Sequence, residues 1–321
     1  MRMKENLIGI DIGGTKCAVS YGRWEADELV VVDKIRFATT EVNETIGRIC
    51  QSVSRMLDKY QLNRENTRGI GISCGGPLSS QKGIIMSPPN LIGWDNVSIV
   101  KTIEELTHIP THLQNDANAC ALAEFRFGAG RGSRNMVFLT LGTGLGAGII
   151  IDGKLYSGTN DNAGEVGHIR LADFGPVGYG KKGSFEGFTS GGGIAQIACS
   201  LIMEQWQQGN RVPWCEYGGL DKVTTRLVAE QATKGDAVAR HAFDIAAEYL
   251  GRGLAILIDT LNPEVIVIGS IFARCEHLLR PRMQQVIDRE ALSCSRQVCV
   301  VKRATLDEQI GDYAALSVAL V

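Results

Sequence analysis

The stretch Asp11-Ile12-Gly13-Gly14-Thr15-Lys16 combines residue types that suit the binding of a phosphate group. It joins two expected strands, 7–12 and 16–21, whereas P-loops and dinucleotide-binding turns open a helix. Its glycines permit positive φ and expose backbone N–H groups to an anion, while Thr15 adds a hydroxyl donor and Lys16 a positive charge. Asp11 ends its strand facing the same space, where a carboxylate is able to hold Mg²⁺ through water. A plain hairpin turn is the alternative interpretation.

A second glycine-rich segment, Gly142-Thr143-Gly144-Leu145-Gly146-Ala147-Gly148, follows the expected strand 135–141. Glycine weakens a strand, so a run of glycines usually indicates that another group approaches the backbone closely. That group is either a nucleotide phosphate or a neighbouring helix. Because both turns follow the first strand of their half of the chain, a duplicated fold would place both on one cleft.

The segment Asn115-Asp116-Ala117-Asn118 follows a short strand and precedes a helical run at 119–128. Asn and Asp are good helix N-caps, and capping alone would explain both residues. Alternatively, Asp116 is a general base that orients a hydroxyl group and takes its proton during phosphoryl transfer.

Three further polar side chains lie in glycine-rich stretches that predict loops: Glu165, His168 and Glu186. A carboxylate accepts hydrogen bonds and an imidazole is able to donate them, so the three suit recognition of a polyol. Solvated loop residues are the alternative for each of them.

The elements that position these residues follow from hydrophobic periodicity. In the first half we expect strands at 7–12, 16–21, 29–38 and 69–74 and a helix at 44–60. In the second half we expect strands at 135–141, 145–151, 154–156, 264–268 and 298–303, and helices at 191–207, 223–233, 236–260, 275–290 and 311–320. Both halves thus begin with strands around a glycine turn, which predicts mixed α/β sheets covered by helices.

Composition narrows the functional classes. The 321 residues carry a net charge of −2, which argues against nucleic acid as a partner. The nine cysteines show no C-x-x-C spacing and lie mostly in apolar runs, so we expect free thiols in a reducing compartment. Neither a signal-peptide pattern nor a run of 18 apolar residues occurs, so we expect a cytoplasmic protein with no membrane partner.

Taken together, these segments resemble the ROK family of sugar kinases and sugar-responsive repressors, and most of all its bacterial glucokinase-like members. The resemblance spans about residues 7–320. The segments that carry it, in the family's order, are Asp11 to Lys16, Pro89-Asn90-Leu91 with Trp94, Asn115 to Asn118, and Leu141 to Gly148 continuing to Glu165-Val166-Gly167-His168.

The resemblance implies a role for each candidate residue. Asp116 would be the catalytic base, and the sugar hydroxyls would be held by Asn90, Asn115, Glu165, His168 and Glu186. Asp11, Gly13, Gly14, Thr15, Lys16, Gly142, Thr143 and Gly144 would hold the phosphates of ATP with Mg²⁺. Gly191 and Gly269 would lie near the adenosine.

The resemblance also implies an actin-like ATPase (ribonuclease-H-like) duplicated fold, with two domains around a cleft and a homodimer. We expect a small domain of residues 1–116 plus 305–321, closed by the last helix, and a large domain of residues 117–304. Two departures stand out. Many family members bind zinc through the histidine and three cysteines, whose positions here hold Val177, Tyr179 and Ser184. We therefore expect no structural zinc. Ser270 follows Gly269 where many members have consecutive glycines.

The leading functional hypothesis is an ATP-dependent hexose kinase that acts on the 6-hydroxyl group, glucose being favoured by the Pro89-Asn90-Leu91-Ile92-Gly93-Trp94 segment. An N-acetylmannosamine or N-acetylglucosamine kinase and a fructokinase are alternatives within the class. A non-catalytic sugar-binding or regulatory protein is the alternative of another class. Because ten residues precede Asp11, too few for a DNA-binding domain, we do not expect a repressor.

Overall fold

The computed structural model describes residues 5–26 and 28–321. One five-stranded sheet is built from β1 (Glu5–Ile12), β2 (Lys16–Glu25), β3 (Glu28–Ala38), β4 (Thr67–Cys74) and β7 (Thr111–Asn115). Its order is β3-β2-β1-β4-β7, with β1 antiparallel to β2 and parallel to β4, and β4 parallel to β7. The parallel strands end in register at Ile12, Cys74 and Asn115. The carboxyl ends of β1, β4 and β7 therefore meet at one edge of the sheet.

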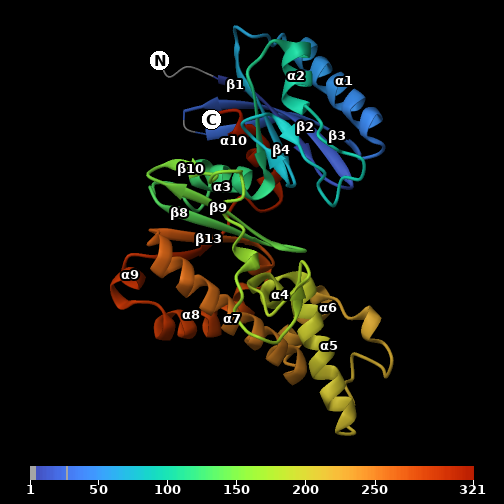
Figure 1. The fold of residues 1–321 in the computed structure, drawn as a ribbon, viewed down its shortest axis with the longest axis vertical. Coiled ribbons are helices and arrows are strands. Elements are labelled where there is room, and N and C mark those ends of the chain that lie inside the picture. Colours follow the sequence, from blue (N-terminus) through green and yellow to red (C-terminus); the bar gives the residue numbers. More distant parts are fainter. Residues whose placement is uncertain (1–4, 27) are drawn as a thin grey trace. The chain divides into compact units, whose positions relative to one another are not determined.

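Helices cover both faces of this first sheet (Figure 1). α1 (Val42–Tyr60) and α2 (Ile99–Thr107) pack against one face, where Ile8, Ile10 and Ile12 join a buried cluster. α10 (Ile310–Val318) packs against the other face. Glycines on that face allow the helix to approach closely, since a Cβ at Gly71 would overlap the carbonyl oxygen of Ala315.

A second five-stranded sheet consists of β8 (Met136–Leu141), β9 (Leu145–Ile151), β10 (Lys154–Tyr156), β13 (Val265–Ser270) and β14 (Val300–Arg303). Its order is β10-β9-β8-β13-β14, with β13 parallel to both β8 and β14. In each sheet the strands thus follow the same order, with the first strand in the centre, the second and third on one side, and the fourth and fifth on the other. The expectation of a duplicated α/β fold is confirmed.

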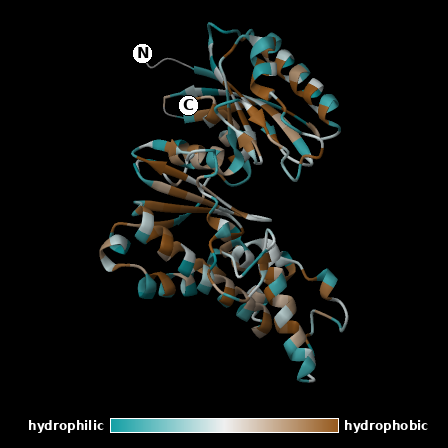
Figure 2. Ribbon diagram, viewed as in Figure 1, coloured by the Kyte–Doolittle hydropathy of each residue, from teal (hydrophilic) through white to brown (hydrophobic). Residues whose placement is uncertain are grey.

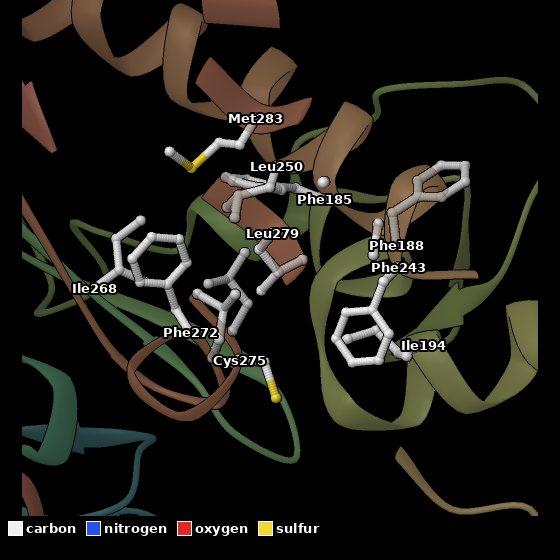
Figure 3. Packing of buried hydrophobic residues seen from close by; sticks show 14 of the residues in the cluster. Phe185, Phe188, Ile194, Phe243, Leu250, Ile268, Phe272, Cys275, Leu279 and Met283 are labelled. Carbon is white, nitrogen blue, oxygen red and sulfur yellow. The ribbon is translucent and has the colours of Figure 1, made fainter. Parts of the chain in front are cut away.

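The remaining helices are α3 (Asp116–Phe127), α4 (Phe185–Thr189), α5 (Gly191–Gln207), α6 (Thr225–Lys234), α7 (Ala237–Leu261), α8 (Ile271–Glu290) and α9 (Ser293–Gln297). Figure 2 shows that hydrophobic residues concentrate along strands such as β8 and β13. In Figure 3, Phe185 of α4 lies beside Leu250 of α7, and Phe272 of α8 lies beside Ile268 of β13. This aromatic core holds α4, and with it Glu186, against the helices that cover the second sheet.

Two compact units can be distinguished in the chain. The first contains the chain up to Ser133, Gly148–Ala163 and Thr305–Val321, and the second contains Arg134–Ala147 and Gly164–Ala304. α3 belongs to the first unit, in which the Arg126 guanidinium donates hydrogen bonds to the carbonyl oxygens of Ser317 and Leu320 at the end of α10. Among the described residues, no helix has the length and apolarity that crossing a membrane requires.

The expected elements agree closely with the observed ones, with differences at their ends. The last-but-one long helix begins at Ile271, four residues before the expected start at 275, because Ser270 ends β13 and the chain turns directly into α8. Several short elements were not expected: α2, α4, α9, the 3-10 turn η1 (Val166–His168), and the hairpins β5 (Leu78–Ser79) with β6 (Ile84–Ile85) and β11 (Val177–Gly178) with β12 (Lys181–Lys182). Two more 3-10 turns are η2 (Leu220–Lys222) and η3 (Asp307–Gln309).

Candidate functional site

The first glycine turn connects β1 to β2 and is held by one hydrogen bond inside it and two from Thr39. The Gly13 N–H donates to the carbonyl oxygen of Lys16 (3.1 Å). At the end of β3, the Thr39 hydroxyl donates to the carbonyl oxygen of Gly13 (2.6 Å), and the Thr39 N–H donates to that of Thr15 (3.1 Å). The backbone of the turn is therefore fixed, while Gly14, Thr15 and Lys16 remain exposed to solvent.

The physical reason for glycine in this turn differs from the expected one. Neither Gly13 nor Gly14 has a positive φ. Instead, a Cβ at Gly14 would lie 2.5 Å from the carbonyl oxygen of Asn90, closer than any real Cβ contact. Glycine is required here because two backbones touch. The same contact brings the sugar-ligand candidate Asn90 next to the phosphate-binding candidates.

The Asn90 loop is fixed by its neighbours in the sequence. Leu91 and Trp94 are almost fully buried, whereas Asn90 is exposed. The Trp94 N–H donates to the carbonyl oxygen of Leu91 (3.2 Å), and the Ser87 N–H donates to that of Trp94 (2.9 Å). The two apolar side chains thus anchor a loop that presents Asn90 at the surface of the first unit.

Asn115 and Asp116 lie where β7 passes into α3. The Asn115 side chain accepts a hydrogen bond from the Asn118 N–H (2.7 Å), so Asn115 is the N-cap that the capping interpretation expects. Asp116 is the first residue of the helix, and its carboxylate accepts from the Ala117 N–H (2.8 Å). The carboxylate reaches solvent, yet the protein atoms crowding its other sides reduce its hydration and raise its pKa. Capping is therefore performed by Asn115, which leaves Asp116 available for another role.

Asp11 lies in an acidic environment at the end of β1. Its pKa is raised from 3.8 to about 6, first by burial and then by the negative charges of Asp312 and Asp116, while Lys34 and Lys16 act in the opposite direction. Asp312 itself accepts a hydrogen bond from the Ser20 hydroxyl (2.7 Å) and forms an ion pair with Lys34. Repulsion between carboxylates is what a bound cation relieves, so Asp11 fits the expected contact with Mg²⁺.

The second glycine turn lies against Glu186 and the start of α5. The Leu145 N–H donates to Oε2 of Glu186 (2.9 Å), and a Cβ at Gly144 would lie 2.8 Å from the same oxygen. The Gly191 N–H donates to the carbonyl oxygen of Gly142 (2.9 Å). The turn 142–144, with Thr143 exposed, therefore sits beside the N-terminus of a 17-residue helix, a position that favours anions.

Glu165 precedes the 3-10 turn η1 and His168 is its last residue, and this turn packs against the same region. A Cβ at Gly167 would lie 2.6 Å from the carbonyl oxygen of Leu145 and 3.3 Å from Cβ of Glu186. The second unit therefore brings η1, Glu186 and the turn 142–144 together, with Glu165 and His168 exposed. In place of the expected loop the chain forms a short helical turn, since the His168 N–H donates to the carbonyl oxygen of Glu165 (3.2 Å).

A cavity of about 740 Å³ lies between α6 and α8, lined among others by Thr225, Ile271 and Arg274. Ile271 lies 3.3 Å from where a Cβ at Gly191 would stand, and the Thr225 hydroxyl donates to the Gly191 carbonyl oxygen. The cavity is therefore next to one of the two adenosine-side candidates. The other, Gly269, is buried in β13 and does not line it.

The residues at the family's zinc positions do not fit a zinc ion. Val177 and Tyr179 supply no thiolate, and the Ser184 hydroxyl accepts a hydrogen bond from the Gly187 N–H (3.0 Å) as the N-cap of α4. All nine cysteines are free thiols. Over residues 5–26 and 28–321, no group of three His, Cys, Asp or Glu side chains is arranged to hold a metal.

Sequence reasoning missed the residues that support the site. Lys34 and Asp312 lie in elements that were expected, and Thr39 directly follows one. No spacing in the sequence links Thr39 to the turn that it holds, or Asp312 to Asp11. Thr225 and Arg274 carry no distinctive pattern in the sequence. The short helix α4 had one available signal, since Ser184 and the charged Glu186 form an N-cap followed by an acidic first turn.

Comparison with known proteins identifies relatives of two kinds. Residues 7–320 match the ROK family model. The chain is 32% identical to a glucokinase from Halalkalibacterium halodurans, over 95% of this chain and 92% of that protein. It is 28% identical to a xylose repressor from Caldicellulosiruptor bescii, over 89% of this chain and 71% of that protein. The crystal structure of a ROK family glucokinase from Streptomyces griseus, in complex with glucose and AMPPNP, is 28% identical and has a TM-score of 0.75, over 98% of this chain and 99% of that one.

Proposed function

Because the chain belongs to the ROK family, we propose that it is an ATP-dependent hexose kinase that transfers the γ-phosphoryl group of ATP to the 6-hydroxyl group of glucose or a similar sugar. Glucokinases are among its relatives and match it over nearly the whole chain. The observation that carries the proposal is the position of Asp116. Asp116 is the first residue of α3, and its carboxylate is not needed as the N-cap. It lies near enough to Asp11 for its charge to raise the pKa of that residue.

In this proposal Asp116 is the general base. A carboxylate within hydrogen-bond reach of the attacking hydroxyl orients that hydroxyl and accepts its proton as the phosphoryl group is transferred. Desolvation raises the pKa of Asp116, which increases its affinity for the proton that it must take up. Its hydrogen bond with the Ala117 N–H keeps the carboxylate in one orientation.

Two sets of backbone N–H groups would hold the ATP phosphates. The first turn offers the N–H groups of Gly14 and Thr15 with the charge of Lys16, and the second offers those of Thr143 and Gly144 at the N-terminus of α5. The N–H groups of Gly13 and Gly142 close the two turns by donating to the carbonyl oxygens of Lys16 and Gly144. Mg²⁺, when bound with ATP near Asp11, would neutralise charge that develops on the phosphates. The cavity between α6 and α8 adjoins Gly191, which follows the second phosphate turn in space, and the cavity has room for an adenosine group.

The sugar hydroxyls would be held by five polar side chains besides Asp116, namely Asn90, Asn115, Glu165, His168 and Glu186. The Asn115 amide uses its oxygen as the helix cap and keeps its NH₂ group for a hydroxyl. Glu186 uses Oε2 to bind Leu145 and keeps Oε1 as an acceptor. For Asn115 and Glu186 the assignment is supported because each side chain is fixed by one hydrogen bond through one oxygen and has a second polar atom beside it. For Asn90, Glu165 and His168 it is supported by their exposed positions.

Replacement of Asp116 by Asn tests the proposed base. We expect turnover to fall by about 10²-fold or more, because the amide cannot accept the proton, while the sugar still binds in calorimetry. Asp58→Asn, an exposed change on α1, serves as the matched control and should leave both quantities unchanged. Undiminished turnover in Asp116→Asn would refute the assignment.

A coupled assay of ADP release against glucose, fructose, mannose, N-acetylglucosamine and N-acetylmannosamine tests the substrate. One sugar turning over much faster than the others would name the substrate class. Turnover of the N-acetylated sugars would favour the amino-sugar kinase alternative, and turnover of fructose the fructokinase alternative. Sugar binding without any ADP release would favour a regulatory protein, a class that is represented among the relatives by a xylose repressor.

We also infer a homodimer in the cytoplasm from the same resemblance. Light scattering after size-exclusion chromatography decides the first point, since a dimer would have twice the 34.7 kDa mass of one chain. A single-chain mass at micromolar concentration would contradict the inference.

A further inference from the structure

The hairpin formed by β11 and β12 stands where zinc-binding relatives have their cysteines. In this chain each of the three cysteine positions has a different structural contact. Val177 exchanges two hydrogen bonds with the Gln196 side chain on α5, its N–H donating (2.9 Å) and its carbonyl oxygen accepting (2.9 Å). Ser184 is the buried N-cap of α4. The hairpin is therefore attached to α5 and α4 without a metal.

Tyr179 occupies the remaining cysteine position, between Val177 and Ser184, and contacts His168. The two rings meet edge to face, with their centroids 5.4 Å apart and their planes at 88°. This is the geometry that aromatic pairs prefer, because the positive edge of one ring meets the negative face of the other. The ring of Tyr179 therefore restricts the orientation of the imidazole.

A second contact fixes the backbone of the same histidine. The Lys181 ammonium group donates a hydrogen bond to the carbonyl oxygen of His168. Next to it, the Arg170 guanidinium donates to the carbonyl oxygen of Lys182 (2.8 Å), and the Phe185 N–H donates to that of Ile169 (2.8 Å). The segment that carries His168 is thus bound to the hairpin on one side and to α4 on the other.

The backbone at the tip of the hairpin supports a role for the Tyr179 side chain. Tyr179 has φ 43° and Gly180 φ 76°, so both central residues of the two-residue turn are in the left-handed region. Asn-Gly is the favoured sequence for such a turn, and an aromatic residue with positive φ is unfavourable there. The side chain is also 72% exposed and adds nothing to the core. Neither the turn nor the core requires tyrosine.

We propose that Tyr179 is a positioning residue for His168 and that, together with Lys181, it takes the place of the metal ion in zinc-containing relatives. This inference rests on the proposed function, in which His168 binds a sugar hydroxyl. The hairpin holds the imidazole through one ring contact and one hydrogen bond to the backbone. Sugar binding in this protein is therefore independent of zinc and dependent on Tyr179.

Tyr179→Asn separates the ring contact from the stability of the hairpin. The variant creates an Asn-Gly turn, so we expect the thermal midpoint to stay the same or rise, while the KM for the sugar rises roughly 3- to 10-fold as the edge-to-face contact is lost. The KM for ATP should not change. Tyr179→Phe keeps the ring and should behave as the wild type. A wild-type sugar KM in Tyr179→Asn would overturn the proposal.

Lys181→Met removes the hydrogen bond to the His168 carbonyl oxygen and should raise the sugar KM in the same way. The matched control is Lys182→Met, because Lys182 takes part in this region through its backbone, whose oxygen accepts from Arg170, and its side chain is exposed. Equal effects of the two substitutions would contradict the role of Lys181.

The imidazole signal of His168 in NMR spectra decides the positioning role without any measurement of activity. We expect Tyr179→Asn to shift this signal, assigned from its absence in His168→Gln, while the signals of the other four histidines stay in place. An unshifted signal would overturn the proposal. If the wild type phosphorylated no sugar, a shifted signal would still support the Tyr179 contact while the proposed function failed.

Metal analysis completes the test. Chelator treatment followed by return to Mg²⁺ should leave the sugar KM unchanged, and zinc should not accompany the purified chain in stoichiometric amount. One tightly held zinc per chain would overturn the proposal.

Discussion

At the scale of single residues, the charge state of Asp11 depends on a side chain far away in the sequence. Asp312 lies in the first turn of α10, is 7% exposed, and is 292 positions from Ser20, whose hydroxyl it binds. Its charge is the largest contribution after burial to the raised pKa of Asp11. The sequence predicts Asp11 as part of a phosphate turn, but it could not predict this neighbour, because nothing in the local spacing marks the partner of a buried carboxylate.

The pH dependence of stability tests this environment. The folded-state pKa of Asp11, about 6, is higher than the ordinary value of 3.8, so its contribution to stability is full below about pH 4 and is lost as the pH rises through 6. Asparagine at position 11 does not ionise, so Asp11→Asn does not have this pH-dependent loss of stability. We therefore expect the variant to gain stability relative to the wild type between pH 4 and 6.5, by roughly 1–3 kcal/mol at the upper end.

Urea unfolding of both proteins at several pH values measures the difference. Asp58→Asn on the exposed face of α1 is the control and should keep the difference from the wild type constant with pH. A constant difference for Asp11→Asn as well would mean that the pKa of Asp11 is not raised. The acidic environment would then no longer support a contact with Mg²⁺.

At the scale of elements, the long helices and the strands of both sheets were predictable, because their apolar residues repeat with helical or strand periods. The elements that hold the second set of site residues were not. α4 has only five residues and the β11–β12 hairpin two residues per strand, too few for any periodicity to appear. The glycines on the sheet face that α10 covers can be seen in the sequence. The sequence does not show why they are needed, which is close contact with a helix from the other end of the chain.

Gly71→Ala tests that contact. The added Cβ would overlap the Ala315 carbonyl oxygen, which is backbone and cannot rotate away, so we expect a loss of about 1–3 kcal/mol or more in the free energy of unfolding. Gly47→Ala in α1 is the matched control, since a Cβ there meets nothing within 4 Å. Alanine favours a helix over glycine, so the control should gain up to about 1 kcal/mol. Similar effects in both variants would contradict the close packing of α10.

Ser270→Gly tests the junction between β13 and α8. Ser270 has φ 58° and ψ −115°, a region that glycine adopts far more easily than serine. We expect the variant to gain about 1 kcal/mol of stability in urea unfolding, although it loses the 3.3 Å contact between the Ser270 and Thr140 hydroxyl groups. Ser200→Gly, inside α5, should lose a similar amount. A loss of stability in Ser270→Gly would show that the hydroxyl contact outweighs the backbone strain.

At the scale of the whole molecule, one buried side chain holds the chain near the first and the last of the four places where it passes between the units. The Glu124 carboxylate accepts from the Ala129 N–H (2.7 Å), just before the chain leaves the first unit after Ser133. It also accepts from the N–H groups of Thr305 (3.0 Å) and Leu306 (2.9 Å), where the chain returns. The division into domains of 1–116 plus 305–321 and of 117–304 stays a prediction, but these bonds show why the last segment belongs to the first unit.

Glu124→Gln tests this arrangement. The amide replaces one acceptor oxygen by a donor, which would face a backbone N–H in the buried site, so we expect a loss of about 2–4 kcal/mol in the stability of the first unit. Hydrogen exchange should rise in α10 and β1 and stay the same in α7 and α8, because the carboxylate accepts its hydrogen bonds from residues of the first unit. Glu105→Gln, which breaks an exposed ion pair with Lys101, should change exchange nowhere by a comparable amount. A uniform rise over both units would mean that they unfold together, and Glu124 would then stabilise the whole chain rather than the return of its last segment.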